Sequence, residues 1–317
     1  MDVRQLKYFV TIVDCAGFSQ ASRQLNIAQP ALSQQISRLE YEVGAPLLTR
    51  SSRGASPTPK GVTLYRHAKF ILRQIDQALV STRETEAEVS GRVTLGLPPT
   101  TICQTGMQIV ERVQRRYPGI LLNVVEGLSG SLQAQAGAGD LDLTVLFAPA
   151  AVPDWTATEL LREELFLVFP VESRIFPDDV KNVSIREIAD VPLILPSSHH
   201  GLRRRVDLEF ERLELIVVPI AEIDSLPVLM HCLQRGLGAT IKPRAAINVH
   251  GAALASQWRC LPIRDVSMNR VNYLYAPPEE ALSPAISAVH AELIALIREE
   301  VAERRWTGVT WIGPEAD

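Results

Sequence analysis

The sequence predicts an α/β protein that carries a small helical head. Apolar residues recur at helical spacing through the first 43 residues, nothing breaks a helix between Val62 and about Val89, and beyond Gly91 short β-branched runs alternate with helical stretches. The 317 residues suffice for two or three domains, and a hydrophobic content of 46% excludes a disordered chain. No run of eighteen apolar residues occurs, so we expect no membrane-spanning helix and no membrane partner.

Three helices are predicted in the head. The first covers residues 4–14, where four apolar residues have the spacing of an amphipathic helix: Leu6, Phe9, Val10 and Val13. The second covers Ser19–Leu25, with Ser19 as its N-cap. The third opens with Pro30, whose missing N–H needs no partner in a first turn, and runs to about Val43. A segment rich in Gly and Pro follows and predicts a β-hairpin or wing.

The third predicted helix pairs an apolar face with a polar face that lacks acids. Leu32, Ile36 and Leu39 fall at helical spacing, and the first acid is Glu40. The opposite face carries Ser33, Gln34, Ser37 and Arg38. A solvated face usually mixes Glu with Lys, so uncharged hydrogen-bonding groups beside an arginine need another explanation.

Charge is distributed unevenly along the chain. Residues 1–73 hold ten Lys and Arg against four Asp and Glu, a net charge of +6. Because the whole chain carries −4, the remainder carries −10. A basic head on an acidic body indicates that the head meets a polyanion.

The long helix predicted over about residues 62–89 carries a weak heptad seam. Its members alternate at spacings of four and three: Leu64, Ala68, Ile71, Ile75, Ala78, Thr82, Thr85 and Val89. A lone helix would leave this seam wet, so we expect it to pair with another chain. The alternative is a helix that lies on its own domain.

Alternating strands and helices predict the body. The strand-like runs are RVTLGL, ILLNVVEG, LDLTVLF, LFLVF, PLILP, LIVVPIAEI, GATIKP and VNYLYA. The predicted helices between them cover residues 104–117, 202–213, 226–235 and 284–305. This order implies mostly parallel sheets covered on both faces. The tail at residues 306–317 is expected to be loosely ordered.

The head resembles that of the LysR-type transcriptional regulators. Their pattern is Ala-x-x-Leu, then Gln-Pro-Ala-Leu-Ser, Leu-Glu, Gly, and Leu-Phe-x-Arg. It is met here by Ala21, Leu25, Gln29, Pro30, Ala31, Leu32, Ser33, Leu39, Glu40, Gly44, Leu47 and Arg50. Leu48 replaces the usual Phe, and Lys60 stands where the family often has Ala. The stretches RQLKYFVTIVD and IAQPALSQQ also resemble the nitrogen-assimilation-control branch.

The resemblance implies a domain plan. An all-α winged helix-turn-helix would occupy residues 1–58, with its helix-turn-helix at about 18–37, and a long linker and dimerisation helix would occupy 59–90. The effector-binding regulatory domain at 91–305 would consist of two periplasmic-binding-protein-like α/β subdomains. Subdomain I would comprise about 91–161 plus 266–305, and subdomain II about 162–265.

In such regulators the third helix enters the DNA major groove, which explains the acid-free face. Amides pair with adenine, Arg favours guanine, and carboxylates are repelled by phosphates. The expected DNA contacts are Ser19, Gln20, Gln29, Pro30, Ser33, Gln34, Ser37 and Arg38. Arg50 and Arg53 in the wing would meet phosphate or the minor groove.

The resemblance also implies a small-molecule effector between the two subdomains. Ligands in open α/β sheets lie beyond strand ends and near helix N-termini, where free N–H groups attract anions. Four strand-to-helix junctions supply the expected effector residues: Thr100, Thr101, Ser129, Gly130, Ser197, Ser198, His199, Arg203 and Ser225. Together with Arg204 and Lys242 nearby in sequence, they predict a small anionic effector, a carboxylate or a sulfate-like species. For a single Ser or Thr, an ordinary N-cap is the alternative.

Other classes fit the sequence less well. Gly127–Ser131 fails the Gly-x-Ser-x-Gly elbow of a hydrolase, and Gly236-x-Gly238 lacks the third glycine of a dinucleotide site. Adjacent His199 and His200 cannot share a face as metal ligands usually do, and four scattered cysteines favour reduced thiols. We expect no enzyme, metal or cofactor. A transport-type receptor is disfavoured by the basic head and the lack of a signal peptide.

The expected setting is cytoplasmic. The partners are double-stranded operator DNA, a small-molecule effector and a second copy of the chain, in a homodimer or homotetramer, with RNA polymerase as a further candidate.

Overall fold

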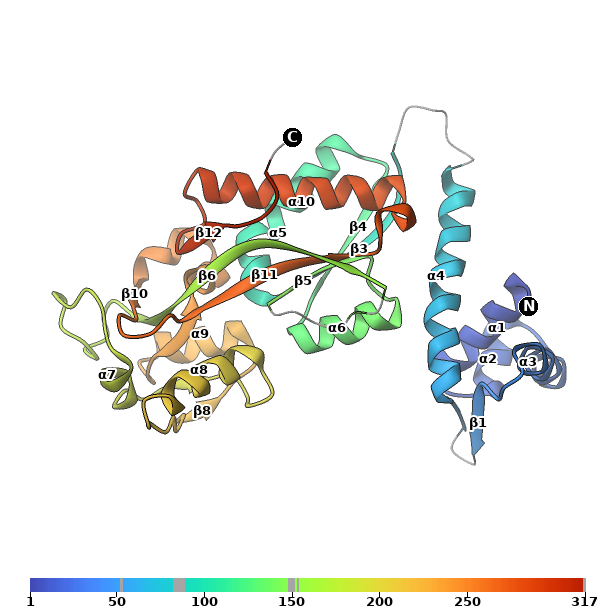
Figure 1. Cartoon of the computed structure of the whole chain (residues 1–317), viewed down its shortest axis with the longest axis horizontal. Helices are drawn as coiled ribbons and strands as arrows, with labels where there is room; N and C mark the ends of the chain where they lie inside the picture. The colour runs from blue at the N-terminus through green and yellow to red at the C-terminus, as the bar shows by residue number, and fades with distance from the viewer. Residues whose placement is uncertain (52–53, 82–88, 148–151, 153, 316–317) are drawn as a thin grey trace. The chain divides into compact units, whose positions relative to one another are not determined.

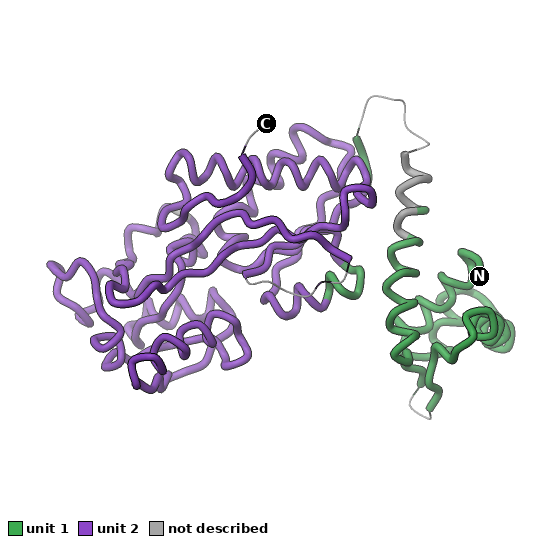
Figure 2. Tube along the Cα trace, viewed as in Figure 1, with its two compact units in different colours: residues 1–91, 135–140 green, residues 92–134, 141–317 purple. Residues whose placement is uncertain are grey.

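The computed structural model describes residues 1–51, 54–81, 89–147, 152 and 154–315. The chain divides into two compact units, residues 1–91 with 135–140 and residues 92–134 with 141–317 (Figure 2). Each unit is considered by itself below.

The head contains three helices and a hairpin, as the sequence predicts. They are α1 (Val3–Asp14), α2 (Phe18–Leu25), α3 (Gln29–Val43), β1 (Leu48–Ser51) and β2 (Gly54–Pro57), with β1 and β2 antiparallel. One apolar cluster joins them, and its fully buried members include Phe9, Leu32, Ile36 and Leu39. The wing and the helical spacing are confirmed.

The second helix begins earlier than expected. Its N-cap is Gly17 rather than Ser19, and Gly17 makes no side-chain cap hydrogen bond. Phe18 is buried in the head core, and this burial places the helix start one residue before Ser19. The expected N-cap role of Ser19 is therefore wrong.

Backbone geometry fixes the two ends of the wing. Gly44 ends α3 at a φ of 72°, a left-handed conformation that suits glycine. Glu40 then points inward, where one carboxylate oxygen accepts hydrogen bonds from the N–H groups of Leu47 and Leu48 at 2.8 and 3.1 Å. At the hairpin, a Cβ on Gly54 would lie 2.2 Å from the carbonyl oxygen of Ala16, so only glycine fits.

The long helix α4 (Pro59–Ser81) packs in part on its own head. Ala68 is fully buried against Leu6 and Val10 of α1, with Leu64 and Ile71 at the edge of the same cluster. The alternative of a helix lying on its own domain therefore holds for the first half of the seam.

The second half of the seam differs from the prediction in one respect. Val89 lies outside the helix, so the predicted end is wrong. Thr82 and Thr85 lie outside the described residues.

The body alternates strands and helices as predicted (Figure 1). Its first half contains β3 (Gly91–Leu97), α5 (Pro99–Arg116), β4 (Ile120–Glu126), α6 (Ser129–Ala138), β5 (Leu143–Leu146), β6 (Thr156–Pro170), α7 (Ile185–Ala189), β7 (Ile194–Leu195) and α8 (Gly201–Glu211). The second half contains β8 (Ala221–Glu222), α9 (Leu226–Gln234), β9 (Thr240–Pro243), η1 (Arg244–His250), η2 (Ala252–Gln257), β10 (Trp258–Pro262), β11 (Asn269–Ala276), η3 (Glu279–Ala281), α10 (Pro284–Ala302) and β12 (Val309–Trp311).

The main sheet is not mostly parallel. Its order is β10-β6-β11-β5-β3-β4, with β9 and β12 also paired to β6. β6 pairs antiparallel with β9, β10, β11 and β12, whereas β3 with β5 is parallel. The expectation was wrong because an apolar run shows that both faces of a strand are covered and carries no information on strand direction.

Strand β6 connects the two halves of the body. Residues 156–164 pair with β11, and residues 165–170 pair with β9 and β10, so the partners change close to the subdomain boundary expected at about residue 161. Alternate residues of its apolar end enter different cores: Leu167 and Phe169 pack on one face, and Phe166 and Val168 on the other. Coverage of both faces is confirmed for this segment.

The tail is better ordered than expected. Val309–Trp311 forms β12 on β6, and Trp306 is buried. Alternating apolar residues in a short segment with two glycines gave too weak a strand signal. Residues 316 and 317 lie outside the described part of the chain. None of the helices within the described residues is long and apolar enough to cross a bilayer.

Candidate functional site

The exposed face of α3 presents the residues expected at DNA. Gln29, Pro30, Gln34, Ser37 and Arg38 are exposed, and Ser33 is half-buried beside them. Leu32, Ile36 and Leu39 on the opposite face are fully buried in the head core. The amphipathic spacing therefore turns the acid-free face outward.

The wing supplies a cation next to that face. The Arg50 guanidinium donates to the Ser33 hydroxyl at 3.0 Å and lies 4.2 Å from the centre of the Phe18 ring. From α2, the Ser19 hydroxyl donates to the Gln29 side-chain oxygen at 3.1 Å. Three elements thus converge on one surface.

Two of the expected DNA contacts stand apart. Arg38 forms an exposed ion pair with Glu42 at 3.3 Å, which partly offsets its charge. Arg53 lies outside the described residues. Gln20 is exposed in the first turn of α2.

The body contains a cleft of about 950 Å³. It is lined by the start of α6, by the turn and first residues of α8, and by residues of β11. Of the expected effector residues, those that line it are Ser129, Gly130, Ser197 and His199.

The remaining expected effector residues lie elsewhere. Arg203 is buried, with ion pairs to Asp207 and Glu222 at 2.7 Å. Thr101 is buried in the first turn of α5. Ser198 and Ser225 are exposed outside the cleft, where Ser225 caps α9 without a side-chain hydrogen bond.

Thr100 acts on the cleft through Arg270. The Arg270 guanidinium donates to the Thr100 hydroxyl and forms an ion pair with Glu163, both at 2.7 Å, and its centre lies 3.4 Å from the centroid of the Phe147 ring. Burial lowers the pKa of Arg270, and Glu163 opposes that shift. Arg270 is therefore a desolvated and rigidly oriented cation at the cleft wall.

His200 rather than Ser198 or His199 caps α8. Its Nδ1 accepts from the Leu202 N–H at 3.1 Å, so the proton of the neutral ring resides on Nε2. Burial, followed by the charges of Lys242 and Arg270, lowers the pKa of His200 to about 4. The ring is therefore neutral at pH 7 and offers one donor.

Lys242 of β9 is a second buried cation. Its side chain makes no hydrogen bond or ion pair within the described part of the chain, and burial, aided by repulsion from Arg270, lowers its pKa to about 7. Asp224 opposes that shift, but the Ser197 N–H and hydroxyl already donate to this carboxylate at 2.9 and 3.0 Å. The ammonium consequently lacks a close counter-ion.

Positive charge dominates the cleft. Its charged lining residues are Arg204, Arg205, Arg270 and Asp224, and Arg205 is paired with Glu209 at 3.0 Å. Arg204 forms no side-chain hydrogen bond or ion pair among the residues described. Desolvated cations with few counter-ions favour a bound anion.

Sequence reasoning missed Arg270, Asp224 and His200. Glu163, Thr100 and Phe147 are distant from Arg270 in sequence, so spacing alone gave no signal for that arginine. The cap role of His200 could have been read from its place directly before the Gly201 helix start.

Metal ligation and thiol chemistry find little support in this geometry. Within the described residues, no group of three or more His, Cys, Asp and Glu is arranged to hold a metal ion. Burial raises the pKa of the Cys103 and Cys260 thiols to about 11, so both remain protonated at neutral pH.

Comparison with known proteins places both parts of the chain. Residues 3–62 match the bacterial regulatory helix-turn-helix proteins of the lysR family, and residues 86–298 match the LysR substrate binding domain. The nitrogen assimilation regulatory protein nac of Escherichia coli is 35% identical over 96% of this chain and 98% of its own length. A probable hydrogen peroxide-inducible genes activator of Mycobacterium avium is 29% identical, over 78% of this chain and 79% of that protein.

A solved structure shows the same fold. ArgP from Mycobacterium tuberculosis superposes with a TM-score of 0.73 at 18% identity, covering 94% of this chain and 97% of that one.

Proposed function

Because the chain belongs to the LysR family of transcriptional regulators, we propose that it reads its operator through α3 and changes its grip on that DNA when a small anion enters the cleft. The cationic cleft carries the second half of this proposal. Arg270 and Lys242 are buried there, and neither cation is solvated enough to dispense with a counter-ion.

The DNA half is tested by comparing specific with random DNA. A duplex selected from a random pool serves as operator, and fluorescence anisotropy measures affinity. Ser33→Ala and Gln34→Ala should each cost about 1–3 kcal/mol on the selected duplex and little on random DNA. Tyr41→Ala is the matched control, because Tyr41 lies on the same helix away from the proposed reading face and is 87% exposed. Equal losses on both DNAs would show that these two residues do not read bases.

The anion half is tested by calorimetry. Sodium sulfate, a series of mono- and dicarboxylates, and the corresponding neutral amides are titrated into the full chain. Anions should bind and amides should not. Arg270→Met should weaken binding by about tenfold or more, since charge-assisted hydrogen bonds contribute about 1.5–3 kcal/mol. Arg186→Met, an exposed arginine on α7, is the control. Tight binding of an amide that Arg270→Met leaves unchanged would contradict an anionic effector.

We further propose that the chain self-associates through the part of the α4 seam that its own head leaves uncovered. Ile75 is half-buried and lies outside the cluster that Ala68 forms with α1. Two linked heads gain affinity for a two-part operator through effective concentration. The proposed setting is the cytoplasm, where operator DNA lies, with RNA polymerase as a candidate partner.

Two other functions are not favoured. A hydrolase built from Ser129, His200 and Asp224 would need Nδ1–H of the histidine to donate to the carboxylate. Here His200 Nδ1 accepts from Leu202 instead. Peroxide sensing would need a thiolate, and burial holds Cys103 and Cys260 protonated. We therefore propose a regulator without catalysis.

A further inference from the structure

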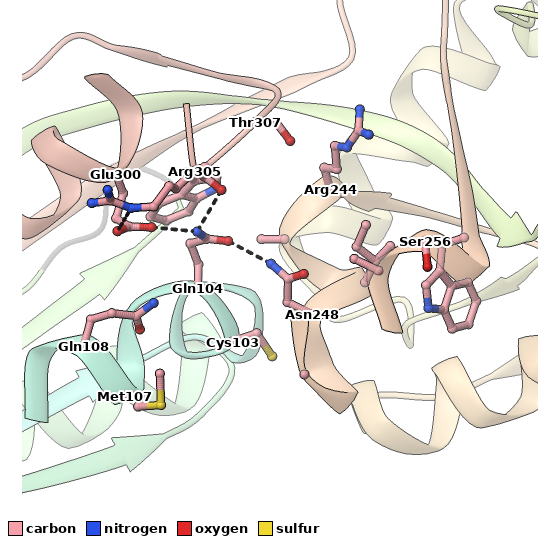
Figure 3. Close-up of a pocket in the computed structure, with 16 residues that line it drawn as sticks. Cys103, Gln104, Met107, Gln108, Arg244, Asn248, Ser256, Glu300, Arg305 and Thr307 are labelled. Carbon is pink, nitrogen blue, oxygen red and sulfur yellow. Dashed lines mark hydrogen bonds and ion pairs between the residues drawn. The ribbon is translucent and has the colours of Figure 1, made fainter. Parts of the chain in front are cut away.

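A second cavity of about 790 Å³ lies apart from the cleft and shares no lining residue with it. We name it the α5–η1 pocket. One wall is α5 with the C-terminal end of α10 and the segment that follows it, and the other is η1, η2 and Trp258 (Figure 3). It therefore lies between parts of the two expected subdomains.

A hydrogen-bonded chain holds the two walls in place. The Gln104 side-chain nitrogen donates to the Glu300 carboxylate at 3.0 Å and to the Arg305 carbonyl oxygen at 3.2 Å. The Gln104 side-chain oxygen accepts from the Asn248 amide at 2.9 Å, so Gln104 bridges Glu300 and Asn248 (Figure 3). Gln104 and Glu300 are both buried. The amide orientations are consequently fixed before any ligand arrives.

The charged groups of this pocket leave one cation unpaired. Arg305 donates to Glu300 at 2.7 Å and is also paired with Glu303. Arg244, the first residue of η1, lines the pocket and makes no side-chain hydrogen bond or ion pair among the described residues. Because Arg244, Glu300 and Arg305 are the charged residues of the described lining, its net charge is +1.

The other walls are largely apolar. Ile247, Trp258 and Met107 contribute side chains, and the Cys103 thiol is neutral because burial raises its pKa to about 11. A rigid indole wall next to a single free guanidinium suits a ligand with a flat apolar body and one negative charge.

We propose that the α5–η1 pocket binds an aromatic monocarboxylate. Arg244 forms the ion pair with the carboxylate, and the apolar walls take the ring. This is a binding site in addition to the cleft, and it does not depend on the identity of the cleft effector.

The test uses a matched pair of probes that differ in charge and hardly in shape. Indole-3-acetate and indole-3-acetamide are each titrated into the full chain by calorimetry. The acid should bind, and Arg244→Gln should weaken it by about tenfold or more, the loss expected for a charge-assisted contact. The amide should bind the native chain about as weakly as the acid binds Arg244→Gln. Arg235→Gln, an exposed arginine at the end of α9, should leave binding of the acid unchanged.

Two further variants separate this site from the cleft. Ser256→Trp places a large side chain at the pocket and should abolish binding of the acid, whereas Arg270→Met in the cleft should not affect it. Circular dichroism melting confirms that each variant is folded. The proposal is overturned if Arg244→Gln binds the acid as tightly as the native chain, if the amide binds as well as the acid, if Arg270→Met removes binding, or if millimolar acid gives no binding heat at two temperatures.

Discussion

Arg270 and Glu163 form a buried ion pair at 2.7 Å on adjacent strands of the central sheet, with side chains 8% and 2% exposed. The remaining carboxylate oxygen of Glu163 is buried without a hydrogen-bond partner among the described residues. Such a pair gives orientation rather than net stability, since the Coulombic gain is offset by desolvation. Its value here lies in holding a cation at the cleft wall.

Breaking this pair on one side should be costly. Glu163→Gln leaves the Arg270 charge buried without a counter-ion, so we expect the free energy of unfolding to fall by about 3–5 kcal/mol. Urea denaturation followed by circular dichroism measures the change. Glu164→Gln is the matched control, because the neighbouring side chain is exposed and its replacement should change stability by less than about 0.5 kcal/mol. A similar small effect for both variants would mean that Arg270 carries no significant desolvation cost.

Lys242 predicts a dependence of stability on pH. Its pKa falls from an ordinary value of 10.5 to about 7 in the folded chain, mainly through burial. The folded state therefore loses stability as pH falls from about 10.5 to about 7 and loses no more below that. Lys242→Met should raise the melting temperature at pH 6, by stabilisation on the order of 3 kcal/mol, and the gain should vanish near pH 10.5. Lys181→Met, at an exposed position, should show no such trend. A gain that is constant across pH would contradict the lowered pKa.

The same lysine predicts the pH dependence of effector binding. A bound anion stabilises the charged ammonium, so binding at pH 8 should take up a proton, and affinity should fall as pH rises from 7 to 9. Titration of the tightest-binding anion of the panel in two buffers of different ionisation enthalpy measures this proton uptake. Lys242→Met should abolish the uptake. Proton release, or uptake that persists in the variant, would assign the titration to another group.

The head was predictable because its signals are local. The stripe of α1, the acid-free face of α3 and the breakers of the wing are all read within a few residues of one another. The cleft was predictable only at Ser129, Gly130, Ser197 and His199, which stand at or near helix starts. Arg270 was missed because Glu163 and Thr100 are brought to it by the crossing of β6 and β11, and no spacing in the sequence encodes antiparallel pairing over that distance.

Arg50 should contribute to DNA affinity without contributing to sequence preference. It lies beside Ser33 and over Phe18, where a guanidinium can meet a phosphate. Arg50→Ala should weaken selected and random duplexes by a similar factor and reduce the slope of log affinity against log salt by about one per contact. Lys7→Ala, an exposed cation on α1, is the control. A loss confined to the selected duplex would instead place Arg50 at a base edge.

Ile75 and Ile71 should behave differently although both belong to the predicted seam. Ile71 packs at the edge of the cluster that Leu6, Val10 and Ala68 form within the head, so Ile71→Asp should destabilise the head itself. Ile75 lies beyond that cluster, so Ile75→Asp should leave the head folded and place a charge in the contact with a second chain, which is strongly unfavourable. Light scattering should then report a smaller species for Ile75→Asp, with an unchanged circular dichroism spectrum. Operator affinity should fall steeply, because the two heads no longer act through effective concentration. An unchanged molar mass would place the interface outside α4, and the uncovered half of the seam would then need another partner.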